Sequence, residues 1–327
     1  MTKTRSTPNF IKILSIIFPV MTLLVLASLP LRLGNYMMRV MNIALITYLC
    51  VLSMYVLLGM CGQNSFAQAG LWGVGAYITG NMALHFELPH FMAMLIATAG
   101  TAVFSFVLGF AFFRLRQFYF TFASIGLMTI LNGLFMNWEP VTGGALGMQN
   151  IPKFSAGGVV FDNEVSFFYM LLFICAAVFL LMRVLFDSVL GRSFMAIRDN
   201  EIAANCMGIN SLLTKSIAFG ISGALCGIAG ALYAFLSGYL SSQTFTFQQS
   251  TMYLIMIMLG GTISPSGAFI GTMIIVLSQE FVRPLANYMQ LIYGAGIMIL
   301  MIVQPEGILG GGKAIYERYL KRQNADA

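Results

Sequence analysis

The sequence has very few charged residues. Asp, Glu, Lys and Arg make up only 9% of its 327 residues, whereas about 25% is usual for a soluble domain. Hydrophobic residues make up 59%, and the mean hydropathy is +0.86. So few charges cannot build a surface that faces water over the whole molecule. The composition therefore excludes an ordinary soluble domain and predicts an all-α, polytopic membrane protein.

Residue types that bind metals or carry out catalysis are also scarce. The chain has two histidines and five cysteines, and the cysteines lack the spacing of metal ligands. We find no cluster of nucleophile, base and acid, so we expect no catalytic residue and no metal site. Residues Gly307 to Ala314 approach a phosphate-binding loop, but no strand precedes them and Ala314 lacks the hydroxyl that would hold Mg²⁺. We expect this chain to bind no cofactor, and another chain to bind any ATP and Mg²⁺.

Long apolar runs fill most of the sequence. A membrane span needs about 20 consecutive apolar residues, and we identify about ten hydrophobic segments. They are 11–31, 40–60, 69–86, 91–113, 117–136, 167–186, 216–240, 251–263, 267–283 and 286–303. The segments 69–86 and 251–263 are short and rich in Gly, so either is a candidate for a broken or re-entrant helix. We predict about 8–10 transmembrane helices in a single domain, residues 1–327, because neither long connection is large enough for a core of its own.

The basic residues predict the orientation of the chain. With the N-terminus in the cytoplasm, 13 of the 17 Lys and Arg residues fall inside and 4 fall outside, in agreement with the positive-inside rule. Both termini and the loop at about 187–215 are then cytoplasmic, and the loop at about 137–166 lies outside. The net charge of +6 suits basic loops at an anionic membrane face rather than a nucleic-acid partner.

One short stretch of the inner loop, residues 193–208, is unusually polar; we call it the charged segment. Nothing from Ser193 to Met207 breaks a helix, and Gly208 would end one well. The segment predicts a short amphipathic helix with a mixed-charge polar side. Helices that lie on lipid favour Lys and Arg on that side, whereas this one has two acids, Asp199 and Glu201, and one base, Arg198. Docking to a protein surface is therefore favoured over binding to the lipid interface.

A second polar stretch, residues 61–68, interrupts two apolar segments; we call it the polar break. Irregular backbone at membrane depth is tolerated only where it faces protein or a wet cavity. The polar side chains are therefore candidates for lining a translocation path, and a plain cytoplasmic turn is the alternative. The candidates are Gln63, Asn64, Ser65 and Gln68.

Two small residues four positions apart, Gly223 and Gly227, lie in the segment 216–240. Small residues at this spacing allow helices to approach closely in lipid. We expect them to form a helix-packing face.

Several motifs occur along the chain in a fixed order. The stretch that contains the charged segment reads Gly191-Arg192-x-x-x-Ala196-Ile197-Arg198-Asp199-Asn200-Glu201-x-Ala203-Ala204-x-x-x-Gly208-Ile209. The others are Leu58-Gly59-x-x-Gly62-Gln63-x-Ser65, Gly73-x-Gly75-Ala76-Tyr77, Arg114-Leu-Arg116-x-x-Tyr119-Phe120, Thr142-Gly143-Gly144-x-x-Gly147, Leu259-Gly260-Gly261 and Pro305-Glu306-Gly307. Together they resemble the branched-chain amino-acid permease family of ABC importers, M-type subunit, over about residues 40–312. The chain departs from the family pattern at 67–70 and 262–267.

The resemblance implies an ABC importer permease fold in the bacterial inner membrane. It also implies a second, H-type permease subunit, two ABC ATPase subunits on the cytoplasmic side and a periplasmic substrate-binding protein. The charged segment would be the helix that enters a cleft of the ATPase. Its implied polar contacts are Arg198, Asp199, Asn200 and Glu201, and the small residues that allow a close fit are Ala203, Ala204 and Gly208.

The function that the resemblance implies is ATP-driven import of branched-chain or related hydrophobic amino acids. Urea, short amides or aromatic acids are alternatives within the family. We add Thr142, Gly143 and Gly144 of the Thr-Gly-Gly loop to the candidates for the translocation path. A secondary transporter or channel is a more remote alternative that would work without an ATPase, and a membrane enzyme would need a catalytic cluster.

Overall fold

The structure is a computed structural model that describes residues 30, 34–86, 88–115, 117–156, 159–262, 264–282 and 294. Apart from Pro30, the predicted segment 11–31 lies outside the described residues. The predicted segment 286–303, apart from residue 294, and the Gly307–Ala314 stretch also lie outside the described residues.

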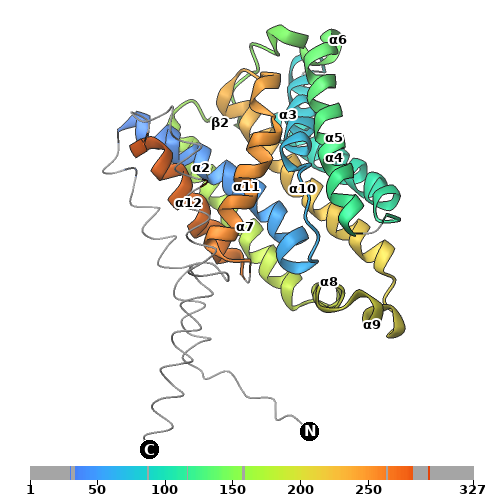
Figure 1. Cartoon of the computed structure of the whole chain (residues 1–327). Coiled ribbons are helices and arrows are strands. Elements are labelled where there is room, and N and C mark those ends of the chain that lie inside the picture. The colour runs from blue at the N-terminus through green and yellow to red at the C-terminus, as the bar shows by residue number, and fades with distance from the viewer. Residues whose placement is uncertain are drawn as a thin grey trace, which may run out of the picture.

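The described residues form a bundle of long helices (Figure 1). The long helices are α2 (Asn35–Met54), which continues as the π-helical turn η2 (Tyr55–Met60), α3 (Gln68–Leu84), α4 (His90–Phe112), α5 (Gln117–Asn137), α7 (Glu164–Asp187), α10 (Ser211–Ser237), α11 (Phe247–Gly260) and α12 (Pro265–Val282). The short elements are α6 (Glu139–Thr142), η3 (Gly144–Leu146), the strands β1 (Ser155–Ala156) and β2 (Val159–Val160), α8 (Val189–Asp199), α9 (Glu201–Cys206) and η4 (Ser242–Thr244). The prediction of an all-α polytopic protein is confirmed. Among the described residues, the named strands are the short antiparallel pair β1–β2.

Five described helices are long and apolar enough to cross a membrane: 35–60, 90–112, 118–137, 164–187 and 211–237. A sixth span is possible if the segments 242–260 and 265–280, which are bent by 116° at the break between them, cross together. The Gly-rich segment at 251–263 is therefore part of a bent pair. The segment at 69–86 forms one unbroken helix, α3, and the irregular backbone lies before it.

The helices at the centre of the bundle differ from those at its edge in burial. The most apolar windows of the α2–η2 helix and of α10 are 89% and 72% buried, whereas that of α4 is 22% buried. Helices α4, α5 and α7 expose large apolar side chains such as Val103, Phe118 and Phe173. In a membrane these faces contact lipid, so apolar residues are expected on both the inner and the outer sides of the bundle.

Small residues let α10 lie close to its neighbours. A Cβ atom at Gly75 on α3 would lie 2.7 Å from the Cα of Gly227, and one at Gly227 would lie 2.9 Å from the Cα of Thr98 on α4. A Cβ atom at Gly223 would overlap the side chain of Ser105, also on α4. The predicted packing face of Gly223 and Gly227 is thus confirmed, and side chains at these positions would push α3 and α4 away.

Candidate functional site

The charged segment lies at one end of the bundle, opposite the end where α6 lies (Figure 1). The prediction of one helix through residues 193–208 is wrong, because the chain breaks at Asn200 into α8 and α9. Asn200 is extended (φ −161°, ψ 105°), and its side-chain oxygen accepts a hydrogen bond from the N–H of Ala203. An Asn in this role starts a new helix, and it overrides the helical pattern around it. Gly208 ends the segment in a left-handed conformation (φ +86°), which is the role predicted for it.

Arg198, the penultimate residue of α8, binds the end of η2, directly before the polar break. Its Nη1 donates a 2.7 Å hydrogen bond to the carbonyl of Gly59, and its guanidinium also contacts Asp199 at 3.2 Å. Just beyond Gly59, Gly62 is left-handed (φ +69°) and the N–H of Gln63 bonds to the carbonyl of Leu57 at 2.8 Å. The bond from Gln63 closes the end of the helix at Leu57 and does not use the carbonyl of Gly59. That carbonyl lies near the negative end of the helix dipole, where a cation such as Arg198 is favourable.

Glu201, the first residue of α9, holds the same region through an ion pair. Its carboxylate lies 2.7 Å from the ammonium of Lys215, the fifth residue of α10. Lys215 is only 4% exposed, and a buried ammonium needs such a partner. Arg198 and Glu201 therefore attach the charged segment to η2 and to α10 at once.

The structure divides the predicted docking residues into two groups. Arg198 and Glu201 contact this chain and Ala204 is buried, whereas Asp199, Asn200, Ala203 and Gly208 are exposed. The exposed face also includes two apolar side chains, Ile202 at 78% and Met207 at 83% exposure. Ile202 was not among the predicted residues. The sequence could have indicated it, because an apolar residue next to polar ones in a short helix is a candidate for an exposed contact residue. We call Ile202 and Met207 the apolar tip.

The polar break is buried, and several of its polar atoms have no partner. Gln63, Ser65 and Gln68 are buried and Asn64 is half-buried. Within the described residues, Oε1 of Gln63, Oδ1 of Asn64 and both amide atoms of Gln68 make no hydrogen bond. Backbone groups of the break are held from α5 and α11: the N–H of Phe66 bonds to Ser124 and the N–H of Ala69 bonds to Ser250. The backbone is thus fixed while the side-chain amides keep hydrogen-bonding capacity.

The Thr-Gly-Gly loop lies at the other end of α3 from the polar break. The amide of Asn81, near the end of α3, donates to the carbonyl of Val141 at 2.8 Å. Gln68 and Asn81 are 13 positions apart on one helix, which corresponds to about 20 Å. The two sets of predicted path residues therefore do not form one site, and α3 runs from one to the other.

The polar groups of the Thr-Gly-Gly loop are used within the loop. The hydroxyl of Thr142 lies 2.9 Å from the carbonyl of Phe135 and 2.8 Å from that of Trp138, and it accepts a bond from the N–H of Gly144. Gly143 and Gly144 both have positive φ. These contacts show that Thr142, Gly143 and Gly144 form a tight turn. Their role in the translocation path stays a prediction.

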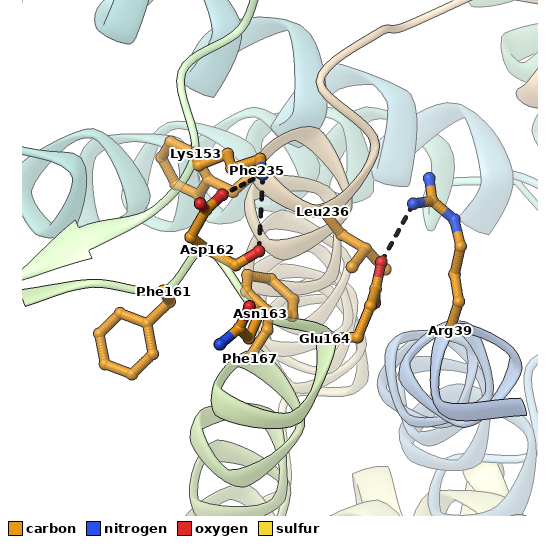
Figure 2. A pocket seen from close by; sticks show the side chains of 9 residues that line it. All are labelled: Arg39, Lys153, Phe161, Asp162, Asn163, Glu164, Phe167, Phe235 and Leu236. Carbon is orange, nitrogen blue, oxygen red and sulfur yellow. Dashed lines mark hydrogen bonds and ion pairs between the residues drawn. The ribbon is translucent and has the colours of Figure 1, made fainter. Parts of the chain in front are cut away.

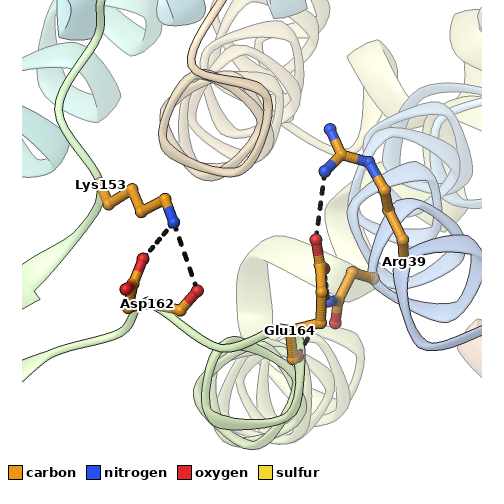
Figure 3. Close-up of polar contacts among 5 residues, drawn as sticks. Arg39, Lys153, Asp162 and Glu164 are labelled. Carbon is orange, nitrogen blue, oxygen red and sulfur yellow. Dashed lines mark hydrogen bonds and ion pairs between the residues drawn. The ribbon is translucent and has the colours of Figure 1, made fainter. Parts of the chain in front are cut away.

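A pocket of about 90 Å³ lies where the loop between α5 and α7 meets α2 and α10 (Figure 2). Four of its lining residues are charged, and they form two ion pairs (Figure 3). Arg39 lies 3.1 Å from Glu164, which also accepts a 2.8 Å bond from Asn42, and Lys153 pairs with Asp162. Because each of these charges is already paired, the pocket joins α2, α7 and the loop but presents no unpaired charge to a ligand.

Comparison with known proteins places the chain among membrane permeases. The family model "Branched-chain amino acid transport system / permease component" matches residues 36–303. The high-affinity branched-chain amino acid transport system permease protein LivM of Salmonella typhimurium (strain LT2) is 30% identical over 314 residues, 88% of this chain and 74% of that protein. LivM of Escherichia coli (strain K12) is 28% identical over 90% of this chain and 74% of its own length.

A second group of relatives has a different named cargo. The autoinducer 2 import system permease protein LsrC of Escherichia coli O9:H4 (strain HS) is 25% identical over 62% of this chain and 58% of that protein. No solved structure matches the chain at a comparable level of significance. The matched region 36–303 contains the polar break, α3 and the charged segment. The resemblance stated from the motifs is therefore confirmed. The chain belongs to the branched-chain amino acid transport system permease family and is a multi-pass membrane permease.

Proposed function

We propose that this chain is one permease subunit of an ATP-driven importer, and that it pairs with a second, H-type permease subunit. Two ABC ATPase subunits bind ATP and Mg²⁺ on the cytoplasmic side, and a periplasmic binding protein delivers the substrate. The proposal rests on one observation above all. A small two-helix unit, α8–α9, exposes an apolar tip at one end of the bundle while Arg198 and Glu201 fasten it to η2 and α10.

The physical argument concerns how force would pass from the ATPase to the path. A segment that only lay on lipid would need no attachment to the interior of the bundle. Here the guanidinium of Arg198 binds the Gly59 carbonyl, and the next irregular residues are the polar break. Movement of α8–α9 would therefore displace the end of η2 and with it the backbone that precedes α3. This favours a coupling role over the interfacial alternative.

The proposed orientation follows from the distribution of charge. The loop of α8 and α9 carries basic residues that suit the cytoplasmic side, whereas the predicted outer loop 137–166 has three acids and one lysine. The N- and C-termini are then cytoplasmic in the bacterial inner membrane. In this orientation the pocket (Figures 2 and 3), which is lined by the loop between α5 and α7, would lie on the periplasmic side, where the binding protein would dock.

The proposed substrate is a branched-chain or related hydrophobic amino acid, as the names of the LivM relatives suggest. The LsrC relatives are named for autoinducer 2 import, so relatives with other cargoes exist. Urea, short amides and aromatic acids are the alternatives that the resemblance leaves within the importer class.

The apolar tip provides the sharpest test of the ATPase interface. We expect Ile202→Asp to abolish co-purification of the ATPase subunits and ATP-dependent leucine uptake, because a carboxylate cannot be buried without a partner in a protein interface. The matched control is Leu146→Asp on η3, since Leu146 is 79% exposed and Ile202 is 78% exposed but they lie at opposite ends of the bundle. Leu146→Asp should retain the ATPase.

The same experiment separates the proposal from its rival. A secondary transporter or channel would take up substrate without the ATPase genes, and Ile202→Asp would leave that uptake unchanged. Normal co-purification and normal uptake with Ile202→Asp would refute the assignment of the coupling surface.

A further inference from the structure

Three polar side chains on α3 are buried without hydrogen-bond partners among the described residues. They are the amide of Gln68, the indole N–H of Trp72 and the hydroxyl of Tyr77, and each residue is at most 5% exposed. A buried polar group without a partner is unfavourable, and most such groups in folded proteins bind something. These three groups on one helix have free hydrogen-bonding capacity inside the bundle.

The rings of Trp72 and Tyr77 lie in one aromatic cluster. Its centre is Phe245, whose ring centroid is 4.8 Å from that of Trp72 and 5.7 Å from that of Tyr77. Tyr233 packs on the indole at 4.7 Å and Phe135 packs on the phenol at 4.8 Å. Gln68 lies one turn before Trp72, on the same face of α3. We call the rings of Trp72, Tyr77, Phe135, Tyr233 and Phe245, together with Tyr253 against the indole, the aromatic cluster.

The residue at the centre of the cluster comes from irregular backbone. Phe245 follows η4 in the connection between α10 and α11, and it is fully buried. The amide of Asn132 on α5 donates to the carbonyls of Ser242 and Phe245, at 3.0 and 2.7 Å. Non-helical backbone within a membrane protein is tolerated where it is covered by protein or lines a cavity. The connection is therefore held in place and directs an aromatic ring toward α3.

We propose that the aromatic cluster and the three polar groups of α3 form a substrate site of the permease itself, closed in this conformation, for a zwitterion with an apolar side chain. This inference rests on the proposed function. The rings would bury the apolar side chain of the substrate. The indole N–H of Trp72 and the N–H groups of Gln68, one turn apart on α3, are donors for a carboxylate. The phenol oxygen of Tyr77 and the aromatic faces suit an ammonium.

The position of the cluster supports this assignment. It lies along α3, between the polar break at the start of the helix and the Asn81–Val141 contact near its end. A molecule that passes from the Thr-Gly-Gly loop toward the polar break would move along this helix. The glycine contacts that bring α10 onto α3 also place Tyr233 against Trp72.

Isosteric substitutions distinguish a substrate site from an ordinary aromatic core. Tyr77→Phe and Gln68→Met remove unpartnered polar atoms while they keep most of the apolar contact, whereas Trp72→Phe also removes one ring and leaves a cavity. In an ordinary core, Tyr77→Phe and Gln68→Met would leave the stability equal or raise it, because an unsatisfied polar group has been removed. For a substrate site we expect the KM for radiolabelled L-leucine, measured in the reconstituted importer at saturating binding protein, to rise about tenfold per variant, with unchanged thermal stability of the Tyr77→Phe and Gln68→Met variants.

Ser105→Ala is the matched control. Ser105 on α4 is fully buried and its hydroxyl also lacks a partner in the described structure, but it faces Gly223 on α10 rather than the cluster. Its KM should equal that of the unaltered importer. Normal leucine uptake with unchanged KM in all three α3 variants would overturn the site and leave the proposed function intact.

A direct binding measurement keeps the two proposals separate. Equilibrium binding of L-leucine to the purified permease–ATPase complex, without binding protein and without ATP, should be weakened about tenfold by Trp72→Phe and unchanged by Ser105→Ala. If the unaltered importer shows no ATP-dependent leucine uptake, the proposed function fails. Absence of leucine binding to the complex overturns the site whatever the uptake result.

Discussion

Individual polar residues in this chain are placed where a buried charge or a free carbonyl needs them. Lys215 would be a buried, unpaired cation without Glu201, and the Gly59 carbonyl would be left without its cationic partner without Arg198. Arg198 and Glu201 are close in sequence, yet their partners lie on different helices. At the residue scale, the polar part of the charged segment therefore serves its own chain as much as a docking partner.

This arrangement predicts the stability of two variants. Glu201→Gln should lower the stability of the solubilised protein by about 2 kcal/mol, because Lys215 keeps its charge in a buried site; the value is reduced because Glu201 is partly exposed. The double variant Glu201→Gln, Lys215→Met should recover most of the loss, since no charge is then buried. The stability of each variant can be measured as the temperature at which half of the solubilised protein is no longer monodisperse. Equal losses in the single and double variants would contradict the ion-pair explanation.

At the scale of elements, the break at Asn200 determines which side chains α9 exposes. A single helix from 193 to 208 would carry the residues after Asn200 along the direction of α8. The extended Asn200 begins α9 in a new direction, with Ile202 and Met207 exposed and Ala204 buried. The cap, and not the hydrophobic pattern, thus defines the apolar tip.

The cap can be tested with a pair of matched substitutions. Asn200→Ala removes a helix cap, at a cost of about 1 kcal/mol, and favours one continuous helix because Ala has the highest helix propensity. We expect reduced leucine uptake and reduced ATPase co-purification at a normal membrane level. Asn200→Asp keeps an N-cap and should retain both activities. Full activity of the Ala variant would show that the break is not required.

At the scale of the whole molecule, the five cysteines can be used to test the proposed orientation. Cys206 at the end of α9 is exposed, and the other four are buried. Burial raises the pKa of the Cys61 thiol to about 12, although the nearby ammonium of Lys215 acts in the opposite direction. At neutral pH Cys61 is therefore protonated as well as covered, and only a thiolate reacts readily.

A membrane-impermeant maleimide should accordingly label Cys206 in inside-out vesicles and not in right-side-out vesicles. Bound ATPase subunits should protect Cys206, because it adjoins the apolar tip, and Cys206→Ser should remove the signal. Labelling only in right-side-out vesicles would reverse the proposed topology. Labelling that the ATPase subunits do not reduce would argue against docking at α9.

The physical basis of prediction differed from one feature to another. Composition and long apolar runs predicted the helices well, because a chain in lipid must bond its own backbone within each span. Gly223 and Gly227 were predicted as a packing face from their spacing alone. The single helix at 193–208 was a wrong prediction, since the capping preference of Asn200 competed with a helical pattern and the pattern alone does not show which prevails.

The sequence by itself determined the class of this protein: scarce charge, span-length apolar segments and the ordered motifs were enough for a membrane permease of this family. The tertiary structure decided which distant residues meet. It joined Arg198 to Gly59, separated Gln68 from Thr142 by the length of α3, and gathered Trp72, Tyr77 and Phe245 from segments far apart in the chain. Local pattern follows from each residue and its neighbours in sequence, whereas these contacts depend on how helices pack, and glycines at the α3–α10 crossing set that packing.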